Sequence, residues 1–202
     1  PSIEVHALKR WSSRMTLLEH ILDVTTQVTF HDGDLTDPFA VADIVARVRP
    51  DRVFHLGAQS FVSPSWTSPE ATFRTNVLGT LYLLEALRRA GLTTTRVLLP
   101  GSGEEYGDVS PADLPITPRT PLLPVNPYAV SKVAQDLLGF EHVASYGQVI
   151  VRVRAFNHEG PRRDQVFALP SFACQIARIE RGLAPPEVRV GNLAARRNWT
   201  DV

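Results

Sequence analysis

Tyr128 and Lys132 lie four residues apart in the segment NPYAVSK at residues 126–132. Pro127 is the kind of residue that opens a helix, and in a helix this spacing puts both side chains on one face. A phenol beside an ammonium is an acid/base device, because the positive charge stabilises the phenolate and draws the tyrosine pKa towards working pH. Tyrosine and lysine at this spacing also occur by chance, so the surrounding elements decide the interpretation.

The composition is that of an ordinary globular domain, with 202 residues, 44% of them hydrophobic and 21% charged. Basic and acidic residues balance at 21 each, which gives no electrostatic reason to expect nucleic acid or an anionic membrane as a partner. No apolar run approaches the ~18 residues that span a bilayer, and we expect a cytoplasmic protein. The single cysteine, Cys174, excludes an internal disulfide, and the six histidines lack metal-site spacing, so no metal is expected.

Apolar strand-like segments alternate with helical patterns along the chain. Strands are predicted at 3–8, 27–35, 51–58, 95–103, 148–157 and 187–190. Helices are predicted at 37–49, 69–90, 127–146 and 168–182, and the segment 59–68, rich in Ser and Pro, is predicted to be a loop. This alternation predicts the doubly wound α/β class, a parallel sheet covered on both faces.

Polar and basic residues follow the predicted strands at their carboxyl ends, where ligands bind in such sheets. These positions are Lys9 and Arg10, Asp34, residues 57–60, residues 102–105 and residues 157–163. Five placements at one edge of the sheet predict a ligand site there.

Six short motifs occur in a characteristic order along nearly the whole chain. They are HDGDLTD, HLGAQS, TNVLGT, GSGEEYG, NPYAVSK and FNHEGPRR. With these motifs in this order, the chain resembles the nucleotide-sugar branch of the extended short-chain dehydrogenase/reductases. Within that branch it is most similar to the GDP-4-keto-6-deoxy-D-mannose reductases, with the GDP-mannose 4,6-dehydratases as the near alternative.

The family's fold begins with a strand and a glycine-rich turn, GxxGxxG, and this sequence contains neither. The resemblance therefore implies an incomplete Rossmann-like cofactor-binding domain at 1–160 and the start of a substrate-binding part at 161–202. In the strand order 3-2-1-4-5-6 the first strand is central, so the strands at 3–8 and 51–58 would lack a neighbour. We expect the 202 residues to be unstable by themselves, because unpaired buried backbone groups are costly.

The turn after the strand predicted at 3–8 bears on the choice of cofactor. In the family an acidic residue at the end of the second strand holds the ribose of NAD, whereas a basic one accepts the 2′-phosphate of NADP. Lys9 and Arg10 stand there and favour NADP over NAD, with Arg10 as principal contact because a guanidinium can grip phosphate through two hydrogen bonds. The alternative is a solvated basic turn.

Further cofactor contacts are implied residue by residue. Asp34 and Leu35 match the family's adenine-binding pair, and Gly57 and Ala58 match small residues that let the cofactor pass close to the backbone. Asn76 has two readings of equal weight, a cofactor-side residue or a hydrogen bonder inside its helix.

Ser102, Tyr128 and Lys132 match the family's catalytic triad. The resemblance implies that Tyr128 protonates the sugar C4 oxygen during hydride transfer, Lys132 binds the nicotinamide ribose, and Ser102 orients the carbonyl. In the dehydratases a glutamate at the position of Glu104 removes the C5 proton, and its neighbour helps the C6 hydroxyl to leave. Here the neighbour is Gly103, which has no proton to give, and this favours reduction.

Four residues are candidates for substrate binding: Asn157, Arg162, Arg163 and Arg197. Asn157 matches a substrate-binding asparagine of the family, and the arginines suit a sugar-nucleotide diphosphate. For Arg163 a surface arginine without this role is an equal alternative. Asn198 replaces the acidic residue that usually follows Arg197 in the family.

The chain is thus predicted to belong to an NADP-dependent reductase of a 4-keto-6-deoxy nucleotide sugar, with GDP as the expected nucleotide. The alternatives are a GDP-mannose 4,6-dehydratase and a non-catalytic binding or scaffold protein on the same fold. The family also implies a homodimer through a four-helix contact formed by the helices at 69–90 and 127–146.

Overall fold

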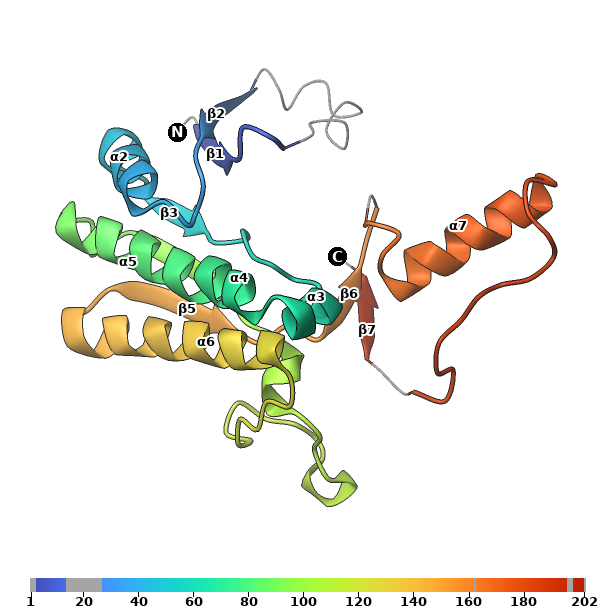
Figure 1. The fold of residues 1–202 in the computed structure, drawn as a ribbon. Coiled ribbons are helices and arrows are strands. Elements are labelled where there is room, and N and C mark those ends of the chain that lie inside the picture. The colour runs from blue at the N-terminus through green and yellow to red at the C-terminus, as the bar shows by residue number, and fades with distance from the viewer. Residues whose placement is uncertain (1–2, 14–26, 162, 196–197, 202) are drawn as a thin grey trace. The chain divides into compact units, whose positions relative to one another are not determined.

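The computed structural model describes residues 3–13, 27–161, 163–195 and 198–201 (Figure 1). The chain divides into two compact units, Pro1–Ala155 and Phe156–Val202, and each is described by itself.

The described residues of the first unit form the strands β1 (Val5–Lys9), β2 (Val28–Asp32), β3 (Arg52–Phe54), β4 (Arg96–Pro100) and β5 (Val149–Val153), and each pairing between neighbouring strands is parallel. β1 pairs with β2, while β3, β4 and β5 form a second sheet in that order. Among the described strands, β1 and β3 each keep one unpaired edge. This confirms the break predicted between the strands at 3–8 and 51–58.

Helix α2 (Pro38–Val48) begins as the sequence predicted. The Asp37 side chain accepts hydrogen bonds from the N–H groups of Phe39 and Ala40, at 2.9 and 3.2 Å, and Pro38 is the first helical residue. Arg49, with φ of 45°, ends the helix before Pro50. The cap satisfies donors that the first turn cannot pair internally.

The segment between β3 and β4 is more helical than predicted. The predicted loop at 59–68 is wrong in part, because it contains helix α3 (Val62–Thr67), within which Ser65 Oγ donates to the Val62 carbonyl at 2.6 Å. The single helix predicted at 69–90 consists of α4 (Pro69–Phe73), a π-helical segment η2 (Arg74–Leu78) and α5 (Gly79–Arg89). Such π segments are often found at functional sites.

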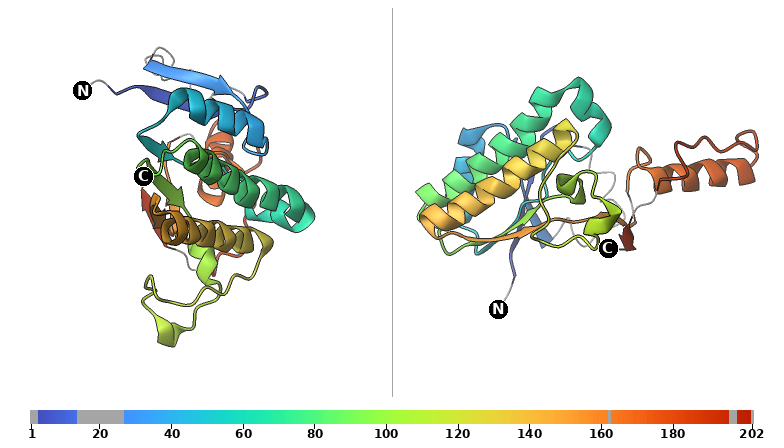
Figure 2. Two further views of the ribbon diagram at one scale, coloured as in Figure 1. Left: turned by 90° about the vertical axis from the view of Figure 1, so that its left-hand side faces the viewer. Right: turned by 90° about the horizontal axis from the view of Figure 1, so that it is seen from below.

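The apolar core lies between the helices and one face of the sheet β3-β4-β5. Its buried members are Val41, Val45, Leu83, Leu84, Ala86, Leu87 and Val97. Figure 2 shows α5 and α6 (Pro127–Tyr146) side by side on this face. The opposite face departs from the prediction of a sheet covered on both sides, since Val151 on β5 and Phe54 on β3 remain 55% and 65% exposed.

Two short 3-10 helices, η3 (Gly103–Tyr106) and η4 (Pro111–Asp113), follow β4 and lie in the long connection to α6. Helix α6 has the bounds that the sequence predicted. Asn126 caps its N-terminus by accepting from the Ala129 N–H at 2.8 Å, and Gly147, at φ of 66°, ends it.

The second unit contains β6 (Asn157–Glu159), α7 (Ala168–Glu180) and β7 (Trp199–Asp201), and β6 and β7 run parallel. The strand predicted at 187–190 is wrong. The backbone N–H and carbonyl of Arg189 bond to the side-chain amide of Gln175, at 2.7 and 3.1 Å, instead of to a neighbouring strand. In the described part of the whole chain, no helix is both long and apolar enough for a bilayer crossing.

Candidate active site

Ser102 stands where β4 ends and caps the short helix η3. Its backbone N–H donates to Glu105 Oε1 at 2.7 Å, and its hydroxyl oxygen accepts the Glu104 N–H at 3.2 Å. Because Oγ acts as an acceptor inside the protein, its own proton is left for an acceptor in a ligand. The turn thus presents a fixed hydroxyl donor.

Tyr128 and Lys132 come from the first two turns of α6, and both side chains are buried. The Lys132 ammonium donates to the Pro100 carbonyl and to Gln135 Oε1, each at 2.9 Å. Burial lowers the pKa of Lys132 to about 8, and the nearby Glu105 carboxylate opposes this effect. The structure therefore places a buried ammonium one helical turn from a buried phenol, as the spacing predicted.

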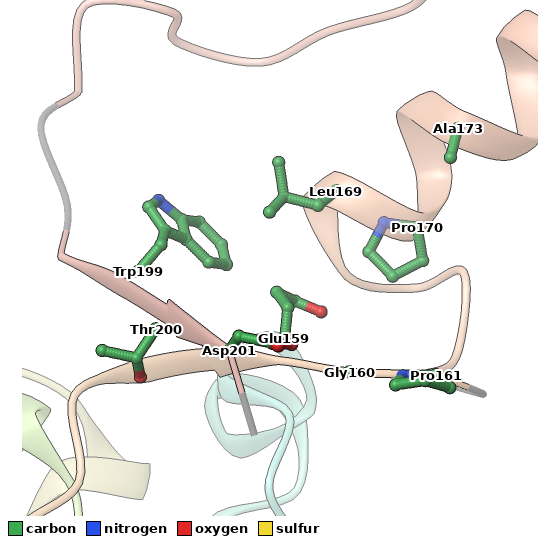
Figure 3. A pocket seen from close by; sticks show the side chains of 9 residues that line it. All are labelled: Glu159, Gly160, Pro161, Leu169, Pro170, Ala173, Trp199, Thr200 and Asp201. Atoms are coloured by element: carbon green, nitrogen blue, oxygen red, sulfur yellow. The ribbon is translucent and has the colours of Figure 1, made fainter.

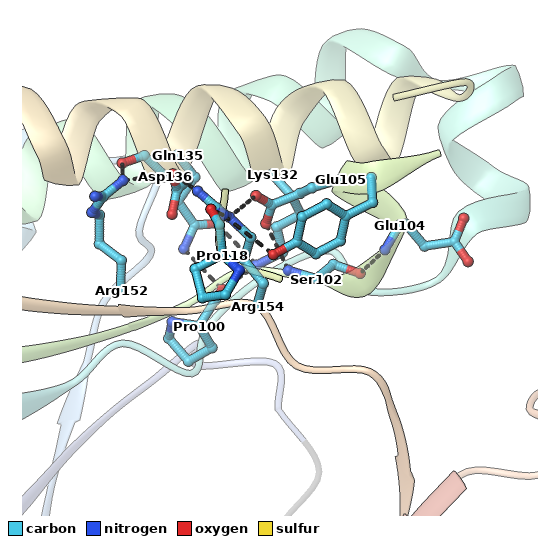
Figure 4. A network of polar contacts seen from close by, with 11 residues as sticks. Pro100, Ser102, Glu104, Glu105, Pro118, Lys132, Gln135, Asp136, Arg152 and Arg154 are labelled. Atoms are coloured by element: carbon cyan, nitrogen blue, oxygen red, sulfur yellow. Dashed lines mark hydrogen bonds and ion pairs between the residues drawn. The ribbon is translucent and has the colours of Figure 1, made fainter. Parts of the chain in front are cut away.

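A buried network of charges lies behind Lys132 and Ser102, and Figure 4 shows its members. Glu105 is fully buried, and its Oε2 lies 3.2 Å from Arg154 Nε. Asp136 accepts from Arg154 Nη2 at 2.9 Å and from Arg152 Nη1 at 2.7 Å. Burial raises the pKa of Glu105. The network fixes the floor of the candidate site.

Sequence reasoning missed this network, although a signal was present. Arg152 lies in β5 and Arg154 directly follows this strand, so the two arginines, two residues apart in extended backbone, point to the same side. That side is covered by α6, which supplies Asp136. Two arginines on a covered face predict a buried carboxylate partner, because unpaired buried charge is costly.

Glu104 is held apart from this network. Its Oε2 accepts from Asn126 Nδ2 at 3.1 Å, and Figure 4 shows the carboxylate directed away from Lys132 and Glu105. The candidate C5 base is therefore anchored to the N-terminus of α6.

Asp34 and Leu35 follow β2 in a tight turn. Asp34 Oδ1 accepts from both the N–H and the hydroxyl of Thr36, each at 2.8 Å, and the backbone bond lowers the pKa of Asp34. A Cβ on Gly57 would lie 2.6 Å from Leu35 Cδ1, so the glycine leaves room for this leucine. Ala58 beside it is half-buried.

Asn76 lies in the π-helical segment and is completely buried. Its Oδ1 accepts from the Gln59 N–H at 2.8 Å, and its Nδ2 donates to the Gln59 carbonyl at 3.0 Å and to Ser131 Oγ at 2.9 Å. Of the two roles weighed for Asn76, these contacts describe the internal hydrogen bonder, which ties the loop after β3 to α6.

The two basic residues after β1 differ in their surroundings. Lys9 forms an ion pair with Asp32 on β2, whereas Arg10 is exposed beyond the strand. A phosphate arriving at this turn would therefore meet the guanidinium of Arg10 first, since the charge of Lys9 is already paired.

In the second unit, Asn157 begins β6, and Arg163 makes several local contacts. Arg163 Nε lies 3.4 Å from Glu159 Oε2, Nη1 donates to the His158 carbonyl at 3.1 Å, and the guanidinium stacks 3.8 Å from the Phe167 ring centre. The predicted ligands Arg162 and Arg197 lie outside the described residues.

A cavity of about 530 Å³ opens in the second unit (Figure 3). Asn157 and Arg163 are close in sequence to three residues that line it, Glu159, Gly160 and Pro161. The wall of the cavity is formed by residues of β6, α7 and β7, namely Glu159, Gly160, Pro161, Leu169, Pro170, Ala173, Trp199, Thr200 and Asp201. In the residues that the structure describes, no group of three or more His, Cys, Asp or Glu side chains is arranged to hold a metal ion.

Comparison with known proteins identifies the family. The family model described as GDP-mannose 4,6 dehydratase matches residues 2–202. The GDP-mannose 4,6-dehydratase of Sordaria araneosa is 40% identical over 198 residues, which cover 97% of this chain and 36% of that protein. The GDP-6-deoxy-D-mannose reductase of Pseudomonas aeruginosa is 38% identical over 172 residues, which cover 85% of this chain and 56% of that protein.

Comparison with solved structures leads to the same group of proteins. The structure of RMD from Pseudomonas aeruginosa complexed with NADPH superposes with a TM-score of 0.83 at 32% identity, covering 98% of this chain and 68% of that one. The chain spans 36% to 56% of the length of the two curated relatives above. The chain belongs to the GDP-mannose 4,6-dehydratase family of the extended short-chain dehydrogenase/reductases, within the nucleotide-sugar branch that the motifs predicted.

Proposed function

We propose that the full-length protein containing this chain reduces a GDP-linked 4-keto-6-deoxy sugar at C4 with NADPH. The observation that carries the proposal is the position of Glu104. Its carboxylate is bound by Asn126 and directed away from Lys132, while Ser102, Tyr128 and Lys132 have the surroundings that carbonyl reduction needs. Gly103 beside Glu104 offers no acid to an eliminating hydroxyl.

The described residues fit NADP at several points. Arg10 is exposed beyond β1 and suits the 2′-phosphate, whereas Lys9 is paired with Asp32. The adenine would lie at Asp34 and Leu35, and the backbone at Gly57 and Ala58 permits close approach. When bound, the reduced nicotinamide supplies the hydride.

Three side chains would act on the carbonyl. Ser102 donates a hydrogen bond to the C4 oxygen, where negative charge develops as the hydride arrives at C4. Tyr128 gives its phenolic proton to that oxygen, so the C=O double bond becomes a C–O single bond while a C–H and an O–H bond form. The Lys132 ammonium stabilises the resulting phenolate, because an opposite charge nearby favours the ionised form.

A GDP-mannose 4,6-dehydratase is the second candidate, and the family match favours it. In that reaction Glu104 would remove the C5 proton. Rotation of its side chain away from Asn126 would be required, at the cost of a hydrogen bond to a charged group.

Two parallel assays separate these candidates. The full-length protein is given NADPH with GDP-4-keto-6-deoxymannose in one reaction and GDP-mannose in another. Reduction predicts one NADPH oxidised for each keto sugar consumed, a loss of about 100-fold or more in Tyr128→Phe, and little change in Glu104→Gln. Conversion of GDP-mannose without net cofactor change, abolished in Glu104→Gln, would establish the dehydratase instead. Binding of both ligands without turnover would indicate the scaffold protein.

We further propose that residues 1–160 bind the cofactor and that residues 161–202 begin the substrate-binding part, with Asn157, Arg162, Arg163 and Arg197 as ligands of the nucleotide sugar. Within the second unit, the cavity beside β6 has an apolar wall and two carboxylates, Glu159 and Asp201, that can accept hydrogen bonds from sugar hydroxyls, and Glu159 also pairs with Arg163. Arginine-to-alanine changes would then raise KM for the nucleotide sugar more than KM for NADPH.

A homodimer through α4–α5 and α6 is also proposed. On α6, Leu137 and Phe140 are 53% and 55% exposed, whereas Leu138 packs against the core. Exposed apolar side chains on α6 favour association with a second copy. Leu137→Glu with Phe140→Glu would convert a dimer to a monomer in analytical ultracentrifugation.

A further inference from the structure

Gln135 lies almost one turn beyond Lys132 on α6 and is 1% exposed. Its Oε1 accepts from Lys132 Nζ at 2.9 Å, and its Nε2 donates to the Pro100 carbonyl at 3.3 Å. The same carbonyl accepts from Lys132 Nζ at 2.9 Å. The three groups form a closed triangle beneath the end of β4, which Figure 4 displays.

The triangle determines which way the Gln135 amide faces. An ammonium can only donate, so Oε1 must be the atom that meets Lys132. The buried NH₂ group then needs an acceptor, and the Pro100 carbonyl provides it. A side chain without both an acceptor and a donor at its end cannot complete this arrangement.

The two groups that hold the Lys132 ammonium are neutral, although charged groups surround it. Those charged or titratable neighbours come from four parts of the first unit: His55 after β3, Glu105 in η3, Asp136 in α6 and Arg154 directly after β5. Glu105 is engaged by the Ser102 N–H and Arg154, and Asp136 by two arginines. His55 bonds to Thr80 Oγ1 at 2.9 Å, and burial with the Lys132 charge lowers its pKa to about 4.

We propose that Gln135 is a positioning residue for the proton transfer, which fixes the Lys132 ammonium through a neutral acceptor and so leaves its positive charge to act on Tyr128. A carboxylate at this place would neutralise the ammonium and draw it away from the phenol. An apolar side chain would leave the ammonium short of an acceptor in a buried site. The inference rests on the proposed function, because it assigns Lys132 the task of stabilising the phenolate.

A direct titration tests the link between these two residues without turnover. This chain contributes two lysines, Lys9 and Lys132, to the spectrum of the full-length protein labelled with ¹³Cε-lysine, and Lys132→Arg assigns the relevant resonance. In Gln135→Glu we expect the apparent pKa of Lys132 to rise from about 8 to about 9 or higher. In Gln135→Met we expect it to fall, since the ammonium loses an acceptor.

The steady-state arm measures kcat and KM across pH with NADPH and the keto sugar. Gln135→Met should lower kcat by about tenfold with little change in KM for the sugar. Gln135→Glu should move the loss of activity on the basic side of the pH profile to higher pH. The matched control is Gln148→Met, which also removes a buried amide with two partners, His142 and the Leu84 carbonyl, but lies beyond the C-terminal end of α6, far from Lys132. It should change stability and leave both the titration and the pH profile as in the wild type.

Wild-type titration of Lys132 in both Gln135 variants would overturn the proposal, as would an equal change in the Gln148 control. A shifted titration in a protein that oxidises no NADPH with the keto sugar would contradict the proposed function instead. A shifted titration together with the kcat effect supports both.

Discussion

Asn126 binds Glu104 and caps α6 with the two ends of one side-chain amide. Its Oδ1 accepts the Ala129 N–H at 2.8 Å, and its Nδ2 donates to Glu104 Oε2 at 3.1 Å. The carboxylate that distinguishes the two candidate reactions is therefore anchored to the helix that carries Tyr128 and Lys132.

Replacing Asn126 with aspartate should separate these two tasks. Asn126→Asp keeps an oxygen for the cap but sets a second carboxylate against Glu104. We expect the variant to lose about 1 kcal/mol of stability at pH 7 from like-charge repulsion, and to recover most of it at about pH 4, where carboxylates begin to take up protons. Urea denaturation of the full-length protein at the two pH values measures the difference.

Asn126→Ser is the control for this experiment, because serine caps a helix without adding charge. It loses the hydrogen bond to Glu104 but sets no like charge against it, so its stability relative to the wild type should change much less between the two pH values than that of Asn126→Asp. If the aspartate variant shows no greater dependence on pH, Glu104 does not lie against residue 126 in solution.

Removing the buried charge of Lys132 should stabilise the protein at neutral pH. The folded-state pKa of Lys132, about 8, is below its ordinary value of 10.5, so the folded state disfavours the ammonium. This penalty is fully present below pH 8 and disappears as the pH rises from 8 to 10.5. Lys132→Met should therefore be more stable by about 1–3 kcal/mol at pH 7, after allowing for the lost hydrogen bonds, and inactive.

The comparison of pH 7 with pH 10.5 is decisive for that prediction. The stability gap between Lys132→Met and the wild type should close at the higher pH. A gap of equal size at both values would mean that packing of the methionine, and not removal of charge, explains it.

Much of the fold could be predicted from local signals. The bounds of α6 followed from Pro127 after a capping Asn126 and from Gly147, and α2 followed from Asp37, Pro38 and Pro50. These are short-range effects that the sequence displays directly. The errors arose where longer-range contacts determine the backbone conformation. The Gln175 side-chain amide hydrogen-bonds to the N–H and the carbonyl of Arg189, which are then not paired with a neighbouring strand, as the predicted strand would require.

The candidate site was predictable in its reacting groups and not in its support. Tyr128 and Lys132 have a recognisable spacing, and the family resemblance implied Ser102. Gln135 lies outside the quoted motifs, and Glu105 lies in GSGEEYG without a role that the motif assigned to it. Glu105 belongs to a run of two acids, and nothing in the sequence near it shows that Arg154, 49 positions later, lies beside it. Such pairs depend on tertiary packing, which places β5 beneath α6.

Asp136 should be among the most costly residues to truncate. It is 3% exposed and receives hydrogen bonds from Arg152 and Arg154. Asp136→Ala leaves two arginines without their shared acceptor, and we expect a loss of about 3 kcal/mol. Asp43→Ala is the matched control, because its ion pair with Arg47 at 3.1 Å is exposed and should be worth under about 0.5 kcal/mol. Equal losses in denaturant titrations would contradict the role of the buried network.

Gly101 should tolerate no side chain, because Glu105 occupies the space beside it. A Cβ at Gly101 would overlap Glu105 Oε1 and lie 2.9 Å from the Val153 carbonyl. We expect Gly101→Ala to displace the Glu105 carboxylate from the Ser102 N–H, to lower stability by about 1–3 kcal/mol, and to reduce kcat more than it raises KM.

Gly191→Ala serves as the control for this change, since nothing lies within 4 Å of the added Cβ. The double variant Gly101→Ala with Glu105→Ala then tests the cause. Glu105→Ala removes the atom that the new methyl group meets. The loss of stability caused by Glu105→Ala should therefore be smaller in the Gly101→Ala background than in the wild type. Additive losses would show that Glu105 is not the group that excludes a side chain from position 101, and that the Val153 carbonyl alone does so.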